Sequence, residues 1–233
     1  LVEQLSEACA EWLHESNFNP ISQYLTVFER GKRGIWTINL LGEQAITEIL
    51  PVLLAKKDWH SDFHQTNLHV TNLVESRTMT ETQFCQEFLT SADVSRRIRV
   101  AFKTPCSFKS QEQYQLFPNT EWMIKSLLRK WHGFAQEVLL EDKEAQQQLI
   151  EHIHITQYQL KSIQYPLKSV KIPAFIGWIT INISGPDALA RLIHLLFGFA
   201  VYSGIGIKTA LGMGGCQIQD LRKVSPNKSL KVE

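Results

Sequence analysis

The stretch GPDALARLIHLLFGFAVYSGIGIKTALGMGGCQIQDL, residues 185–221, decides how the last part of this chain folds. Its Gly-Pro-Asp start is typical of a helix beginning, because proline suits the first turn and aspartate suits the positive end of the helix dipole. Apolar residues continue to about Tyr202, and Gly204 can end the helix there. Residues 216–221 are strand-like, so we expect a helix, a glycine-rich loop and a final strand.

The glycine-rich loop holds five of the twelve glycines of the chain, together with Lys208 and Thr209. It is not a P-loop, because Ile207 stands where that motif requires glycine before the lysine. It is not a dinucleotide-binding fingerprint either, because Thr209 takes the place of the third glycine and the loop follows a helix. A cap glycine followed by a bulged strand stays open as an alternative, but it explains Gly204 better than the four later glycines.

Length and charge leave room for two domains with different partners. The 233 residues suit one large or two small domains, and the net charge is only +1. Residues 1–90 carry 6 Lys and Arg against 12 Asp and Glu, whereas residues 91–233 carry 18 against 11. The basic second part suggests a surface that faces a polyanion, although uneven scatter of surface charge would give the same counts.

The cysteines and the most apolar stretch indicate a cytoplasmic protein without a membrane partner. The four cysteines are scattered and predict reduced thiols, not disulfides or a zinc site, so we expect neither a metal nor a cofactor. Residues 189–201 are apolar but too short to span a bilayer, and they contain Arg191 and His194. A buried helix explains this stretch better than a membrane span.

The pattern of the second part predicts a β-α-β-β-α-β order. Alternation from Arg97 predicts a strand, and apolar residues at helical spacing after Asn119 predict a helix. Two strands, the helix from Gly185 and the final strand follow. This order is that of the ferredoxin-like split unit. The two middle strands are expected at residues 152–163 and 172–183.

The first part repeats most of this order, so we predict an α+β fold of two tandem ferredoxin-like domains, residues 1–90 and 91–233. The expected elements are α-β-β-α-β, which is the same unit without its first strand. We therefore expect the chain to begin inside its first domain. These elements are a helix up to Leu13, a hairpin of Tyr24–Glu29 and Ile35–Leu40, a helix over Glu43–Leu54 and a strand over Asn67–Val74.

The glycine-rich loop, written as G-x-G-x-K-T-x-x-G-x-G, resembles that of the RAMP superfamily of CRISPR-associated proteins. Two further stretches, RIRVAFKTPCSFKSQEQYQLFPN at residues 97–119 and IPAFIGWITINI at residues 172–183, are similar to the repeat-processing endoribonuclease, the sixth Cas protein family. The resemblance covers essentially the whole chain and is stronger from about residue 96 onward.

This resemblance implies metal-independent cleavage of CRISPR precursor RNA within its repeats. The ribose 2′-hydroxyl attacks the adjacent phosphate and leaves a 2′,3′-cyclic phosphate and a 5′-hydroxyl. Such chemistry requires a base, an acid and positive charge on the phosphate oxygens. The implied partner is CRISPR repeat RNA, and effector-complex proteins and a homodimer stay open.

The resemblance also implies a catalytic histidine at the end of the first helix, in a Leu-His-Glu setting that Leu13–Glu15 matches. A histidine in a last helical turn is favoured as imidazolium, which suits His14 as a general acid. A solvated helix-end histidine would give the same local sequence.

Two departures from the family pattern leave the catalytic set incomplete. Residues 16–20 contain no lysine, and a tyrosine found earlier on this helix in some members would fall before Leu1. We therefore consider Arg30 and Lys32, in the turn after Tyr24, as sources of positive charge for the transition state.

The glycine-rich loop and a basic strand are the predicted RNA-binding surfaces. Exposed glycine N–H groups at Gly204, Gly206, Gly212 and Gly214 would form a nest for phosphate oxygens. Lys208 and Thr209 would add a charge and a hydroxyl donor. A basic groove is expected from these side chains: Arg97, Arg99 and Lys103, which are in phase on one strand, with Lys168 and Lys171 on a later one.

Two other interpretations stay open. The same superfamily contains non-catalytic subunits that hold guide RNA, for which His14 would be incidental. An RNA-binding tandem outside CRISPR biology is the less favoured interpretation, because the sequence shows no aromatic base-stacking motif of the kind typical of an RNA-recognition sheet.

Overall fold

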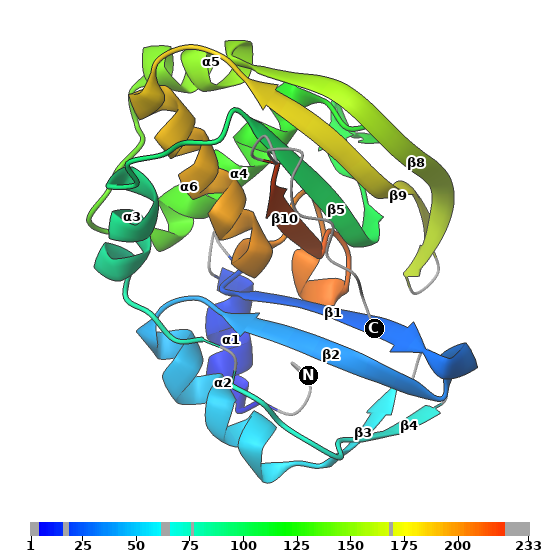
Figure 1. The fold of residues 1–233 in the computed structure, drawn as a ribbon. Helices are drawn as coiled ribbons and strands as arrows, with labels where there is room; N and C mark the ends of the chain where they lie inside the picture. The colour runs from blue at the N-terminus through cyan, green and yellow to red at the C-terminus, as the bar shows by residue number, and fades with distance from the viewer. Residues whose placement is uncertain (1–4, 16–18, 62–65, 76, 168–169, 222–233) are drawn as a thin grey trace, which may run out of the picture.

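The computed structural model describes residues 5–15, 19–61, 66–75, 77–167 and 170–221. The helices and short hairpins of the first part, apart from α3, lie beneath the larger second part (Figure 1). Its elements are α1 (Glu7–Glu15), β1 (Ile21–Phe28), η2 (Glu29–Gly31), β2 (Arg33–Leu40), α2 (Glu43–Ala55), β3 (Asp58–Ser61), β4 (Thr66–His69) and α3 (Glu81–Leu89).

The second part is built on a four-stranded sheet with the strand order β10-β5-β9-β8, in which all neighbours are antiparallel. The predicted β-α-β-β-α-β order is observed, with α5 and the small β6–β7 hairpin added to it. The elements are β5 (Arg97–Cys106), β6 (Phe108–Ser110), β7 (Gln113–Gln115), α4 (Thr120–Phe134), α5 (Lys143–Glu151), β8 (Ile153–Leu167), β9 (Val170–Ile183), α6 (Asp187–Ser203), η3 (Thr209–Leu211) and β10 (Cys216–Asp220).

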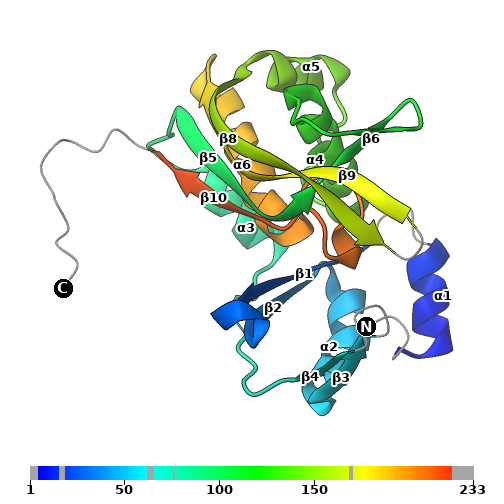
Figure 2. The ribbon, with the colours of Figure 1, turned by 90° about the vertical axis from the view of Figure 1, so that its right-hand side faces the viewer.

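One face of this sheet is covered by α4 and α6, and the strands stand in front of these helices in Figure 2. Alternation along β5 decides which residues turn inward. Ile98, Val100 and Phe102 are buried in the core with the helices, whereas Arg97 and Lys103 are exposed on the other face. We call that other face the open face of the sheet.

The helices α4 and α6 begin where their sequences predict, and α6 also ends where predicted, whereas α3 and α5 were not predicted. The side chain of Asn119 caps α4 by accepting a hydrogen bond from the Trp122 N–H. Gly204 ends α6 with a φ of 67°, a conformation that glycine adopts without strain. No helix among the described residues is long and apolar enough to cross a membrane.

The prediction of a strand over residues 67–74 is wrong for most of its length. The strand β4 ends at His69, and it pairs with β3 in a separate hairpin instead of joining β1 and β2. Residues 71–74 have exposed side chains and no regular structure, and a segment without buried side chains has little to hold it in a sheet. The first part therefore contains two hairpins.

A small cluster of Ile172, Ala174 and Met213 is separate from two main cores among the described residues. The larger one joins the inner face of the sheet to α4 and α6, and it also receives Phe84 and Cys85 from α3. The smaller one lies among α1, α2 and the β1–β2 hairpin and includes Cys9, Leu13 and Ile49. The helix α3 thus packs with the second part of the chain, although it precedes residue 90.

Candidate functional site

The glycine-rich loop lies mostly inside the protein, and its amides are hydrogen bonded there. The N–H of Gly204 donates to the Ala200 carbonyl at 2.8 Å, and the N–H of Gly214 donates to the Pro105 carbonyl at 2.9 Å. The N–H of Gly206 donates to the Ser126 hydroxyl at 3.0 Å. These three amides cannot donate to a phosphate while those bonds persist, which corrects the expectation of an open nest at these positions.

Atoms of the protein itself leave no space for side chains at the glycines of this loop. A Cβ at Gly206 would lie 2.3 Å from the Ser107 carbonyl oxygen, and a Cβ at Gly214 would lie 2.0 Å from that of Ile205. At Gly215, a Cβ would lie 2.4 Å from the ring of Tyr24, which belongs to β1. Such separations are too short for any side chain, so the loop is glycine-rich because the backbone is closely packed.

Only the tip of the loop reaches the surface. Lys208 is exposed and Gly212 is half-buried, whereas Thr209 is only 9% exposed, with its methyl group turned toward Gly204. The hydroxyl of Tyr165, near the end of β8, donates to the Leu211 carbonyl at 2.6 Å. Of the loop residues expected to contact RNA, Lys208 is therefore the best placed.

A buried lysine holds the start of the loop. The Nζ of Lys130 on α4 donates to the carbonyls of Ser203 and Gly204 at 3.1 and 2.8 Å, at the C-terminus of α6. Lys130 is 7% exposed, and burial lowers its pKa to about 7. Lys130 lies three residues after Leu127 and four before Phe134, and that spacing places it on the apolar face of α4.

The start of β1 binds the loop and brings α1 near it. The hydroxyl of Ser22 donates to the Tyr202 carbonyl at 2.5 Å, and the Nε2 of Gln23 donates to the Ala210 carbonyl at 2.7 Å. His14 is exposed in the last turn of α1, and β1 begins six residues after that helix ends. The histidine and the loop therefore both adjoin the start of β1.

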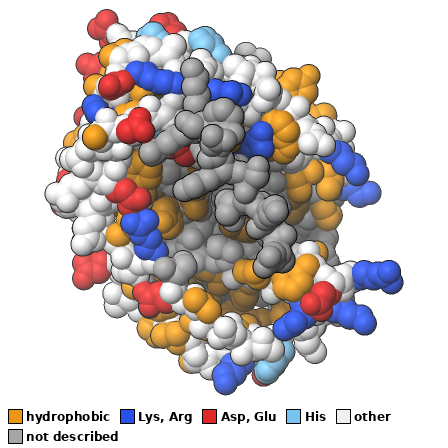
Figure 3. Space-filling view, in the orientation of Figure 1, with side chains coloured by type: hydrophobic (Ala, Val, Ile, Leu, Met, Phe, Trp, Pro, Cys, Tyr) orange, Lys and Arg blue, Asp and Glu red, His pale blue; other side chains and the backbone are white. Residues whose placement is uncertain are grey.

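The structure does not bring Arg30 and Lys32 to His14. Both side chains are exposed in the turn that joins β1 to β2, and this turn is at the opposite end of β1 from α1. Figure 3 shows the basic side chains of this end at lower right. The eight residues of β1 span about 25 Å at roughly 3.3 Å per residue, so these cations are far from the histidine.

Three predicted cations form a row along the open face of the sheet. Arg97, Arg99 and Lys103 lie on β5, and none has an ion-pair partner among the described residues. The row leads to the loop, because the N–H of Lys103 donates to the Gly215 carbonyl at 2.7 Å. Lys171 is exposed at the start of β9, and Lys168 lies outside the described residues.

Five of the other described histidines hydrogen bond to backbone carbonyls or to polar side chains. The side chains of His132 and His194 hydrogen bond to backbone carbonyls, and His152 contacts the Ser184 hydroxyl. His60 and His69 face Asn67 and Asp58 across the β3–β4 hairpin. Within the described ranges, no three His, Cys, Asp or Glu side chains gather to hold a metal ion.

Comparison with known proteins identifies one family. The model of the family described as CRISPR-associated endoribonuclease Cas6 matches residues 100–216. The chain is 28% identical over 222 residues to the CRISPR-associated endoribonuclease Cas6 of Streptococcus thermophilus, with 94% of this chain and 88% of that protein covered. It is 26% identical over 230 residues to the protein of the same name from Mycobacterium tuberculosis, with 95% and 70% covered.

A solved structure shares the fold. The structure described as the product complex of Cas6 (TTHA0078) superposes with a TM-score of 0.77 at 21% identity, and the match covers 91% of this chain and 87% of that one. At this identity the likeness concerns the fold.

Proposed function

This chain belongs to the Cas6 family of CRISPR-associated endoribonucleases, and from that premise we propose that it cleaves CRISPR precursor RNA within the repeats. The family match and the likeness over nearly the whole chain to a curated Cas6 endoribonuclease carry this proposal. The proposed substrate is the repeat RNA. We assign RNA contacts to Lys208 at the loop tip and to the row of cations on β5, Arg97, Arg99 and Lys103. Among the described residues, none of these cations has an acidic partner.

The proposed reaction is a transesterification that needs no metal ion. The 2′-oxygen bonds to phosphorus while the bond from phosphorus to the 5′-oxygen breaks, which gives a 2′,3′-cyclic phosphate and a 5′-hydroxyl. Solvent water accepts the proton of the 2′-hydroxyl, and the departing 5′-oxygen receives a proton. His14 is assigned the second transfer as general acid, because it is exposed and stands at the negative end of α1.

The fold assignment belongs to the same proposal. We assign the second part of the chain to a ferredoxin-like unit and the first part to an incomplete unit of that kind, in which only β1 and β2 pair in one sheet, with the division near residue 90 and α3 packed against the second unit. The sheet order β10-β5-β9-β8 supports this for the second unit. Arg30 and Lys32 are left out of the catalytic set because of their distance from α1. Transfer of product to effector-complex proteins, a homodimer and a cytoplasmic location are proposed from the resemblance.

The test is cleavage of repeat RNA by the purified protein in EDTA. We expect cutting to continue, to stop when the nucleotide before the scissile phosphate carries a 2′-deoxyribose, and to be lost in His14→Ala. The matched control is His69→Ala, an exposed histidine on β4, which should cut normally. Tight binding without any cutting by the wild-type protein would instead support a non-catalytic RNA-binding subunit.

A further inference from the structure

An arginine lies over the ring of a tryptophan in the middle of the open face. The guanidinium carbon of Arg99, on β5, lies 4.2 Å from the ring centroid of Trp178, on the neighbouring strand β9. The indole N–H donates to the Gln159 side-chain oxygen at 3.0 Å, which fixes the ring. The cation–π contact and this hydrogen bond therefore hold the pair in place before any ligand arrives.

The charge of Arg99 is not neutralised by the protein. No acidic side chain pairs with it within the described ranges, and its Nε is buried without a hydrogen-bond partner there. Arg96, the residue next to Arg97 on the chain, differs because its guanidinium pairs with Asp187 and donates to the Gly185 carbonyl. A stacked arginine that keeps its full charge is suited to an anionic and planar ligand.

A groove of about 510 Å³ opens beside Arg99, between β5 and β10, and also reaches Ile218 and Val201. Gln219 lies directly opposite Arg99 across the strands, and Gln217 lies opposite Ala101, so both amides border the groove. Amide groups donate and accept hydrogen bonds, as the edges of nucleobases require. Lys103 adds an exposed ammonium at the end of the groove nearer the loop, where a phosphate would be stabilised.

We propose that this groove binds an unpaired nucleotide of the RNA substrate, with its base stacked on the outer face of the Arg99 guanidinium. The inference rests on the proposed function for the choice of RNA. It adds a base-binding position on β5, β9 and β10, separate from the tip of the glycine-rich loop where Lys208 is exposed. Stacking on a guanidinium plane accepts any base, and Gln217 and Gln219 then favour some bases over others by their hydrogen bonds.

The test uses labelled single-stranded RNA oligonucleotides: one of adenylate, one of uridylate, and one of the same length with abasic riboses. We expect the wild-type protein to bind the base-bearing oligonucleotides about tenfold more tightly than the abasic one, since one stacked base has roughly this effect. Arg99→Met and Trp178→Leu should remove that preference, and Trp178→Phe should keep part of it. Thermal unfolding shows that the variants are folded.

Arg97→Met is the matched control, because Arg97 lies on the same strand and face without an aromatic partner. It should weaken all three oligonucleotides by the same factor and leave the preference for bases intact. Equal affinity of the wild-type protein for base-bearing and abasic oligonucleotides would overturn the base-binding groove, even if repeat RNA is still cleaved. If the preference is present but repeat RNA is never cut, the proposed function fails and the groove stands.

Discussion

At the level of single residues, the glycine-rich loop is shaped by nearby carbonyl oxygens, one from another segment and one from the loop itself. The backbone at Gly206 and Gly214 passes so close to Ser107 and Ile205 that no side chain fits between them. Lys130 then binds the carbonyls at the end of α6, where the negative end of the helix dipole favours a cation. Glycine and lysine thus hold the loop in one conformation, and Lys208 is presented at its tip.

Gly214→Ala should lower the free energy of unfolding by about 3 kcal/mol or more, because a positive φ and a backbone clash act together. The matched control is Gly31→Ala, which has a φ of 85° and open space around the new methyl group. Gly31→Ala should lower the free energy of unfolding by only about 1 kcal/mol. Denaturant unfolding of both variants measures the two losses. Equal losses would show that the close approach at Gly214 has no energetic effect.

Lys130 should make stability depend on pH. Its pKa is about 7 in the folded protein against 10.5 as its ordinary value, so between these values the unfolded chain binds a proton that the folded protein does not. Stability therefore rises with pH across this window, by at most about 1.4 kcal/mol per pH unit from this group. Below about pH 7 both states are protonated and this contribution is constant.

The prediction is checked by denaturant unfolding of Lys130→Met and of the wild-type protein over this pH range. The contributions of the other titrating groups to stability cancel in the difference between the two curves. The wild-type curve should rise more steeply above pH 7. Lys125→Met, on the exposed face of the same helix, should follow the wild-type curve. Parallel curves for Lys130→Met and the wild-type protein would mean that the buried amine is protonated throughout.

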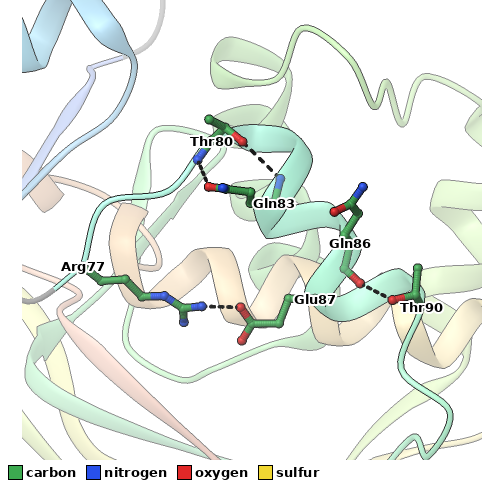
Figure 4. Close-up of polar contacts among 6 residues, drawn as sticks. All are labelled: Arg77, Thr80, Gln83, Gln86, Glu87 and Thr90. Atoms are coloured by element: carbon green, nitrogen blue, oxygen red, sulfur yellow. Dashed lines mark hydrogen bonds and ion pairs between the residues drawn. The ribbon is translucent and has the colours of Figure 1, made fainter.

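At the level of elements, α3 connects the two parts of the chain and is held by its own capping box. Thr80 accepts from the Gln83 N–H at 3.2 Å, and the Gln83 side chain accepts from the Thr80 N–H at 3.0 Å (Figure 4). The aromatic ring of Phe84 then enters the larger core, where it contacts Trp131 and Phe199. A short helix with a complete cap thus fixes the path of the chain between the two cores.

Thr80→Ala should lower the free energy of unfolding by about 1 kcal/mol, because the Gln83 N–H at the start of α3 loses its acceptor, the Thr80 hydroxyl. The comparison is Arg77→Met, which breaks the exposed ion pair with Glu87 beside the same helix (Figure 4). Exposed ion pairs contribute little, so this variant should lose less stability than Thr80→Ala in denaturant unfolding. If Arg77→Met lowered the free energy of unfolding more than Thr80→Ala, the cap would not be the stronger of the two contributions to stability.

At the level of the whole molecule, the β1–β2 hairpin of the first part lies against the glycine-rich loop of the second. Side chains from β1 hydrogen bond to Tyr202 and Ala210, and Tyr24 packs on Gly215. The helix α1 with His14 is joined to the same end of the hairpin. The contact between the two parts therefore sets where the proposed acid stands relative to the cations that are assigned to RNA.

Lys208→Ala should weaken repeat RNA binding and flatten the dependence of log affinity on log salt by about one unit, because one phosphate contact is lost. Lys109→Ala is the control, since that exposed lysine is already paired with Glu112. It should leave the slope unchanged when binding is titrated at several salt concentrations. An unchanged slope in Lys208→Ala would remove Lys208 from the interface.

Most elements of the second part could be predicted from local patterns, whereas the first part was harder. The alternation of β5 and the caps of α4 and α6 depend on neighbours along the chain, which the sequence displays. The register of β4 depends on a partner that its sequence does not specify, and it pairs with β3. The position of Arg30 and Lys32 at the far end of the hairpin likewise follows only from the direction of β1.

The sequence by itself determined the order of elements in the second part and the positions where helices stop, because these follow from side-chain periodicity and from glycine and proline. It also placed Arg97, Arg99 and Lys103 on one face of a strand. Only the tertiary structure decided why the loop is rich in glycine, and that Trp178 lies under Arg99. Both depend on which distant backbone or side chain comes within a few ångströms, and a one-dimensional pattern does not contain that distance.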